Sequence, residues 1–124
     1  MSDETAKALA SDRTIDITTT GRKSGQPRRI EIWFHRLDGK YYITGTPGHP
    51  RDWYANLVAH PQFTFHLKET ATADLPATAR PVTDQAEREK VLTGILASLP
   101  DMTSAPGQEP AVWFEGSPLV EVTF

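Results

Sequence analysis

The 124-residue chain has no cysteine, which excludes a disulfide framework, a thiolate metal site and a thiol nucleophile. It also lacks an apolar run long enough for a signal peptide or a membrane span, so we expect a cytoplasmic protein without stable membrane insertion. An excess of basic residues is missing too: the formal net charge is -3. Because general nucleic-acid binders are usually basic, we expect no nucleic-acid partner.

The length fits one compact domain with one core, which we place over residues 1–124. Hydrophobic residues make up 38% of the chain, enough for a small core. Residues 1–12 are mostly polar and are predicted to form a flexible lead-in or a short helix.

Two early stretches alternate between two faces, as strands do. In residues 13–20 the shared face carries Ile15, Ile17 and Thr19, and residues 29–37 alternate in the same way. The dipeptide "DG" that follows predicts a tight hairpin turn, because glycine takes a positive φ without steric penalty. The sequence "KYYITGT" would be the return strand. The pattern therefore predicts an antiparallel meander of three strands.

The pattern then changes to helical spacing in "DWYANLVAHP", where Trp53 and Leu57 are four residues apart. Asp52 is a candidate N-cap of this short helix, and Pro61 would end it. Residues 62–68 are predicted to form a strand with its phenylalanines inward. Residues 71–82 are a weaker strand, which Pro76 assigns to an edge or a bulge.

A longer helix should begin at Asp84, since Glu87 stands three residues later as its capping partner. Residues 100–110 are rich in proline, glycine and serine and indicate a loop, and residues 119–124 alternate as a last strand. The fold class is thus mainly β (α+β), with about six mostly antiparallel strands and two to three helices around a small barrel or half-open sheet.

The most unusual stretch is "TTTGRKSGQPRR" at residues 18–29, which holds four of the thirteen Lys and Arg residues of this slightly acidic chain. A tight turn containing glycine directs backbone N–H groups into one concavity, and arginine adds bidentate donors for phosphate or carboxylate. A solvated hairpin would have the same composition, so spacing alone leaves both interpretations open. A Walker loop is excluded, because its residue order and its following helix are missing.

These motifs, in this order, resemble the deazaflavin-dependent nitroreductase family, a part of the split β-barrel flavin and deazaflavin oxidoreductases. The resemblance covers residues 14 to 68 and rests on "TTGRKSGQPR", "DGKYYI" and "DWYANLVAHP". It implies a split β-barrel and the deazaflavin coenzyme F(420), whose phosphate and oligoglutamate tail carry several negative charges. The basic turn would then be the site for these charges.

By the same resemblance, particular positions become candidate site residues. Those expected to bind the cofactor are Arg22, Lys23, Ser24, Gln26 and Arg28 at the phosphate, Glu31, Ile32 and Trp33 beside the ring, and Gly45, Thr46, Trp53 and Asn56, which complete the pocket. The implied reaction transfers a hydride to a small-molecule electron acceptor: a quinone, a nitroaromatic or an activated enone. Candidate proton donors to that acceptor are Tyr54, His49 and Thr46. The chain would be a monomer or a homodimer.

Two alternatives remain open, because many relatives carry Pro-Leu-Tyr or a similar triplet where this chain has Glu31-Ile32-Trp33. One is an FMN-binding split-barrel oxidoreductase, and the other is a non-catalytic binding protein for a small apolar or acidic ligand. No metal is expected. His35 and His66 could be neighbours across strands, but they have no carboxylate or histidine beside them at ligand spacing.

Overall fold

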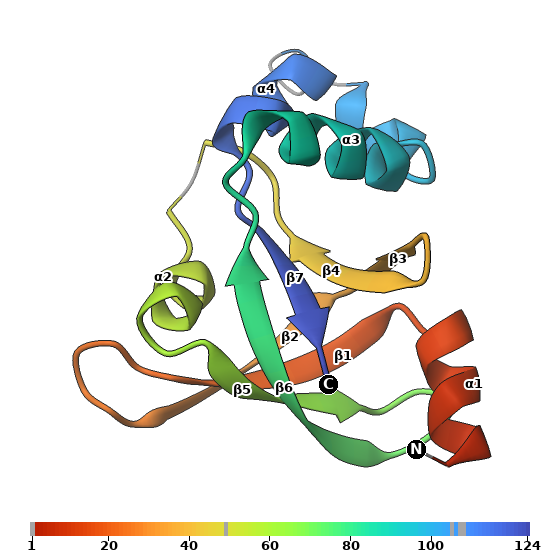
Figure 1. Cartoon of the computed structure of the whole chain (residues 1–124), viewed down its shortest axis with the longest axis vertical. Helices are drawn as coiled ribbons and strands as arrows, with labels where there is room; N and C mark the ends of the chain where they lie inside the picture. The colour runs from red at the N-terminus through yellow and green to blue at the C-terminus, as the bar shows by residue number, and fades with distance from the viewer. Residues whose placement is uncertain (1, 49, 105, 107–108) are drawn as a thin grey trace.

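The computed structural model describes residues 2–48, 50–104, 106 and 109–124. Within these residues, a mainly antiparallel sheet of seven strands curls into a half-barrel, with four α-helices around it (Figure 1). The helices are α1 (Asp3–Ser11), α2 (Asp52–Ala59), α3 (Gln85–Leu96) and α4 (Pro110–Gly116), with a 3-10 helix at Pro100–Thr103. The strands are β1 (Thr14–Thr20), β2 (Pro27–Trp33), β3 (His35–Leu37), β4 (Lys40–Thr44), β5 (Gln62–Leu67), β6 (Ala73–Pro81) and β7 (Leu119–Thr123). The predicted fold class is confirmed.

The sheet has the order β2-β1-β5-β6-β7-β4-β3. The single strand predicted over 29–37 is wrong, because the chain bends at Phe34, whose side chain is buried and whose N–H donates to the Arg13 carbonyl at 2.9 Å. Before the bend, β2 pairs with β1, and after it β3 pairs with β4. The meander is therefore interrupted, and the bent segment connects the two ends of the sheet.

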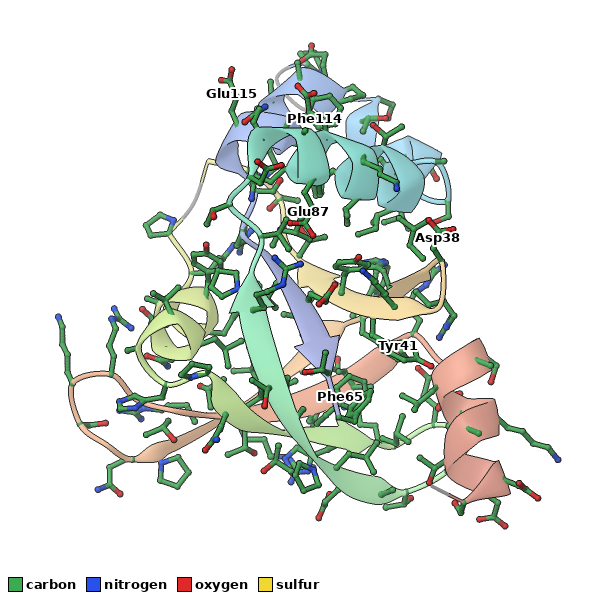
Figure 2. All side chains as sticks on the ribbon, in the orientation of Figure 1. Asp38, Tyr41, Phe65, Glu87, Phe114 and Glu115 are labelled. Carbon is green, nitrogen blue, oxygen red and sulfur yellow. The ribbon has the colours of Figure 1, made fainter. Side chains whose placement is uncertain are left out.

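The interior of the half-barrel is filled by the inward faces of β1, β5 and β7. Ile15 and Ile17 are fully buried there, as their alternation predicts. Aromatic rings gather at the same place: the Phe34 ring meets Phe65 edge-to-face at 5.1 Å and lies tilted against Tyr41 at 6.2 Å. Figure 2 shows Tyr41 and Phe65 in the space that the strands enclose. This packing buries apolar surface and so stabilises the sheet.

Pro76 lies in the part of β6 that pairs with β5 alone, opposite Thr64. The ladder between β6 and β7 covers only 78–81. Proline therefore sits where its missing N–H removes no hydrogen bond to a second neighbour, which agrees with the predicted edge position.

A second hydrophobic cluster lies under α3 and α4. The predicted cap of α3 is confirmed, since the Asp84 carboxylate accepts from the Glu87 N–H at 2.9 Å. Helix α4 was not predicted, yet it carries Trp113, which is 1% exposed. Figure 2 shows Glu115 of α4 pointing outward. None of the described helices is long and apolar enough to cross a membrane.

Candidate functional site

The basic turn connects β1 to β2 and projects beside α2 (Figure 1). Its shape is fixed by backbone hydrogen bonds: the Gly21 N–H donates to the Gln26 carbonyl at 2.8 Å, and the Gly25 N–H donates to the Gly21 carbonyl at 2.8 Å. Gly25 has a φ of 70°, a conformation that favours glycine. Ser24 Oγ accepts from the Gln26 N–H at 3.2 Å. The turn is therefore an ordered loop.

Helix α2 holds this turn through Asn56. The Asn56 Oδ1 accepts from the Arg22 N–H at 3.1 Å and from Arg22 Nη1 at 3.0 Å. Its Nδ2 donates to Thr19 Oγ1 at 3.2 Å. Asp52 was predicted to cap α2, but Arg51 is at the N-cap, and Asp52 is the first helical residue. From there Asp52 Oδ1 pairs with Arg22 Nη2 at 3.3 Å.

Between the turn and α2 lies a pocket of about 400 Å³. Three cationic side chains and one carboxylate lie in its wall, while an indole and an isoleucine supply apolar surface. The basic turn and "DWYANLVAHP" therefore meet at one site. The lining residues are Thr19, Gly21, Arg22, Lys23, Ser24, Arg28, Ile30, Asp52, Trp53 and Asn56.

The pocket keeps positive charge available for a ligand. Lys23 and Arg28 are exposed and form no ion pair within the described part of the chain, whereas Arg22 pairs with Asp52. A Cβ at Gly21 would lie 2.6 Å from Ser24 Oγ and 3.7 Å from Arg28 Nε, so the absent side chain leaves room for these groups. Guanidinium and ammonium groups around a glycine turn suit an anion with more than one charge.

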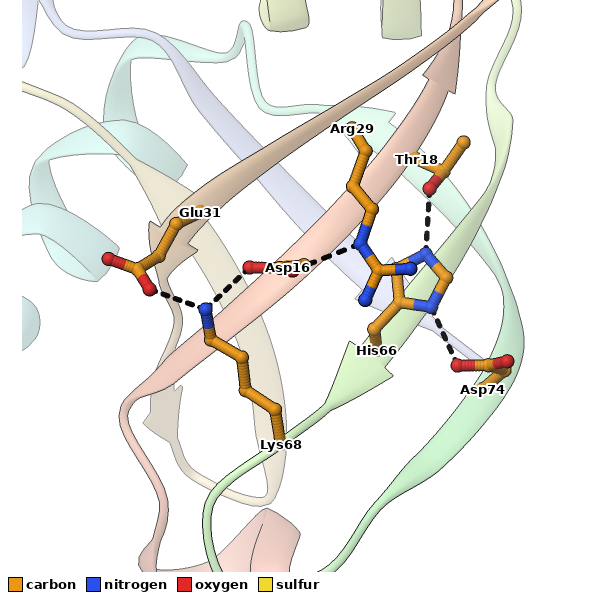
Figure 3. Close-up of polar contacts among 7 residues, drawn as sticks. All are labelled: Asp16, Thr18, Arg29, Glu31, His66, Lys68 and Asp74. Atoms are coloured by element: carbon orange, nitrogen blue, oxygen red, sulfur yellow. Dashed lines mark hydrogen bonds and ion pairs between the residues drawn. The ribbon is translucent and has the colours of Figure 1, made fainter.

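Four candidate cofactor residues on the turn and β2 lie outside this pocket lining: Gln26, Glu31, Ile32 and Trp33. The Glu31 carboxylate forms a short ion pair with Lys68, which also reaches Asp16 Oδ1 at 2.7 Å (Figure 3). Trp33 is 44% exposed, and the Arg13 guanidinium lies 5.1 Å from its ring centre. Glu31 thus has a cationic partner on the outer face of the sheet.

Two of the predicted proton donors, Thr46 and Tyr54, lie outside this pocket lining. Thr46 Oγ1 accepts from Arg51 Nη2 at 2.5 Å, and Gly45 lies beside the same arginine. Tyr54 stacks edge-to-face on Trp53, with ring centres 6.0 Å apart, and lines a second pocket of about 250 Å³. His49 lies outside the described residues.

The idea that His35 and His66 are neighbours is wrong. His35 pairs with Tyr42 in the β3–β4 hairpin, whereas His66 lies on β5, with Nε2 2.7 Å from Thr18 Oγ1 and Nδ1 2.7 Å from Asp74 Oδ1 (Figure 3). The hydrogen bond from His66 lowers the pKa of Asp74. Among the described residues, no group of three potential ligands could hold a metal ion.

Sequence reasoning missed four lining residues: Thr19, Gly21, Ile30 and Asp52. Thr19 lies on β1 and Ile30 on the paired strand β2, near the two ends of the turn. Alternation along a strand shows which face each residue occupies, but not that a pocket lies on that face. Asp52 was interpreted as a cap, and its position beside Arg22 depends on where α2 packs. The usable signal was the turn itself, because residues flanking an ordered turn must lie near it.

A sequence model of the F(420)H(2)-dependent quinone reductase family matches residues 3–105. The chain belongs to this family. The matched segment contains the whole pocket lining, and the predicted relationship to deazaflavin-dependent enzymes is confirmed. The chain is therefore an oxidoreductase of the F(420)-dependent reductase type.

Several solved structures resemble this chain. An F(420)H(2)-dependent reductase (FDR-A) is 26% identical with a TM-score of 0.63, over 90% of this chain and 95% of that chain. A conserved hypothetical protein from Mycobacterium tuberculosis is 21% identical with a TM-score of 0.69, over 99% of this chain and 80% of that chain. An FAD-binding protein from Mesorhizobium loti is 15% identical with a TM-score of 0.67, over 98% and 88%. The last two show the shared fold alone.

Proposed function

We propose that this reductase binds F(420) between the basic turn and α2 and transfers a hydride to a quinone. The observation that carries the proposal is the pocket itself, which gathers Arg22, Lys23 and Arg28 in a chain whose net charge is -3. The phosphate and glutamates of F(420) are the kind of polyanion that such a set of cations binds.

The residues present fit the anionic part of the cofactor. Lys23 and Arg28 have no ion pair among the described residues and would face the phosphate, with Ser24 as a neutral donor. Gly21 leaves space for Ser24 Oγ and Arg28 Nε. Gln26 would join them only through its side chain, since its N–H and carbonyl bond within the turn.

The resemblance extends the ligand toward Ile32 on one side and Gly45 and Thr46 on the other, whereas Glu31 is paired with Lys68 on the outer face and Trp33 is exposed. When bound, reduced deazaflavin supplies the hydride. The protein orients the cofactor and excludes water, and Trp53, 9% exposed, and Ile30 supply the apolar wall of the pocket. The resemblance makes two hydroxyls the candidate proton donors to the reduced acceptor: that of Thr46, and that of Tyr54, whose ring centre lies 6.0 Å from that of Trp53.

A quinone is the acceptor that the family name indicates, and nitroaromatics and activated enones share its electrophilic character. Steady-state oxidation of F(420)H(2) with menadione, a nitroaromatic and cyclohexenone as separate acceptors tests the proposal. We expect turnover with the quinone, and a lower kcat/KM with the other two. Absence of turnover with every acceptor, despite cofactor binding, would contradict the proposed reaction.

FMN is the second candidate cofactor, because the resemblance is to a group of split β-barrel enzymes that includes flavin as well as deazaflavin oxidoreductases. A flavin nucleotide carries less negative charge than a cofactor with an oligoglutamate tail. Three cations around one pocket therefore favour the deazaflavin. A yellow protein as purified, with no measurable F(420) binding, would support FMN instead.

A further inference from the structure

Arg22 differs from the other two pocket cations because it already has partners on α2. Its side chain is 33% exposed, and Nη2 lies 3.3 Å from Asp52 Oδ1. The Asp52 side chain is 90% exposed and stands in the pocket wall. An ion pair with so exposed a carboxylate contributes little to the stability of the fold, because water solvates the carboxylate when the pair is broken.

Asn56 fixes the arginine from the buried side. It is 4% exposed, and its Oδ1 accepts from both the backbone N–H and Nη1 of Arg22, while its Nδ2 donates to Thr19 Oγ1. One amide therefore sets the position of the turn and the direction of the guanidinium. Because both ends of the amide are bonded, it has one orientation only.

We propose that α2 controls anion binding through Arg22: Asn56 positions the guanidinium, and Asp52 is an internal anion that occupies Nη2 until a ligand anion displaces it. This inference rests on the proposed function and specifies which ligands the site selects. A ligand with one negative charge gains little by replacing Asp52 at Arg22. A ligand with several charges also reaches Lys23 and Arg28, so the site favours a polyanionic tail.

The experiment compares wild type with Asp52→Asn, which removes the carboxylate and keeps the size. Glu4→Gln on α1 is the matched control, since it changes the net charge equally outside the pocket lining. Each protein is titrated calorimetrically with inorganic tripolyphosphate, with acetate and with F(420). We expect Asp52→Asn to bind tripolyphosphate and F(420) about two- to fivefold more tightly, as the loss of an exposed competing ion pair implies.

Asp52→Asn should also change the selectivity of the site between acetate and tripolyphosphate. Asp52→Asn should gain proportionally more for acetate than for tripolyphosphate, because the single charge no longer competes with an internal carboxylate. Glu4→Gln should match wild type for all three ligands. Unchanged or weaker tripolyphosphate binding by Asp52→Asn would overturn the inference.

The role of Asn56 has its own readout. The Arg22 N–H is bonded to Asn56 Oδ1, so its hydrogen exchange should be slow in wild type and in Asp52→Asn, and fast in Asn56→Leu. Asn56→Leu should also bind tripolyphosphate about fivefold more weakly, as the loss of a hydrogen bond to a charged group implies. If Asn56→Leu does not fold, Thr19→Val removes only the partner of Nδ2 and should give a smaller loss. Slow exchange of Arg22 with unchanged binding in the folded variant would exclude the positioning role.

The two proposals fail in different ways. If tripolyphosphate binding responds to Asp52→Asn while F(420) does not bind, the internal anion is supported and the cofactor assignment is wrong. If F(420) binds tightly and Asp52→Asn changes no affinity, the cofactor assignment stands and the internal anion is wrong.

Discussion

Arg28 and Arg29 are adjacent in β2 and have opposite surroundings. Arg28 lines the pocket beside α2, whereas Arg29 Nε donates to Asp16 Oδ2 at 3.0 Å on the outer face of the sheet. Successive side chains of a strand point to opposite faces, so one step along the chain separates a pocket cation from a structural one. The pair provides a matched test of the site.

Arg28→Ala should weaken F(420) binding by about tenfold or more, because a hydrogen bond between charged groups is lost. Arg29→Ala changes the net charge equally and should leave the Kd within about threefold. Arg29→Ala should instead lower the free energy of unfolding, by no more than about 1 kcal/mol, because the ion pair with Asp16 is exposed on the arginine side. Fluorescence titration and urea unfolding measure both quantities. Equal weakening of binding by the two substitutions would contradict the assignment of the pocket.

Gly21→Ala should destabilise the protein by about 1–3 kcal/mol, because the new methyl group would lie 2.6 Å from Ser24 Oγ. The Gln26 carbonyl, at 3.3 Å, limits how far the turn can shift. The double variant Gly21→Ala, Ser24→Ala removes the nearest atom and should regain part of the loss. Thermal unfolding of the two variants and of Ser24→Ala alone measures this coupling. A fully additive double variant would show that the contact is not the cause.

His35 should make the protein less stable as the pH falls. Burial, with the charges of Arg13 and Arg36, lowers the pKa of His35 from 6.5 to about 4 in the folded chain. The unfolded chain therefore takes up a proton first, so the stabilisation present above pH 6.5 is lost as the pH falls toward 4. Between about pH 7 and about pH 5 this loss is about 2 kcal/mol.

The variant His35→Gln stays neutral and should lose about 2 kcal/mol less over the same pH interval. The pKa values of Asp16, Asp74 and Glu87 are lowered by their cationic or histidine partners. The stability that these carboxylates contribute is therefore lost mainly below about pH 5, under the interval in which His35 acts. Urea unfolding at the two pH values separates the effects. An identical pH dependence in the variant and in wild type would rule out His35 as the group responsible.

Arg88→Met should destabilise the protein by about 2–4 kcal/mol. Arg88 is 8% exposed and donates to the carbonyls of Val82, Phe114 and Ser117 at 2.7–2.9 Å, so methionine would leave these acceptors without their donors. Lys90→Met on the exposed face of α3 is the control and should change stability by less than about 0.5 kcal/mol. Chemical denaturation of both variants decides whether the buried guanidinium anchors α4.

Local chemistry determines the parts of the fold that the sequence predicts. The Asp38-Gly39 turn is an example: both residues have positive φ, 53° and 76°, as a tight hairpin requires. Asp84 caps α3 as its spacing with Glu87 indicates. In each case the stabilising contact lies within a few residues of the signal.

Contacts between distant segments determine what was missed. The bend at Phe34 depends on core packing against Phe65 and on a hydrogen bond to Arg13. Helix α4 follows a loop-like composition, and Trp113 becomes a core residue only because α3 covers it. Periodicity cannot show either contact, since it carries information about one segment at a time.

The site follows the same rule. The composition of the basic turn indicates an anion site or a solvated hairpin, and the resemblance to a family selects the first. The link from Asn56 to Arg22 spans 34 residues and depends on the packing of α2 against β1. No local pattern contains that distance, so the role of Asn56 in holding the turn required the structure.

Both the proposed reaction and the role of Arg22 depend on F(420) binding in the pocket beside α2. The most direct test is a fluorescence titration of the wild-type protein with F(420) and, in parallel, with FMN. We expect saturable F(420) binding, much weaker FMN binding, and loss of F(420) binding in the double variant Arg22→Ala, Lys23→Ala. Tighter binding of FMN, or F(420) binding that survives the double variant, would show that this pocket is not the F(420) site.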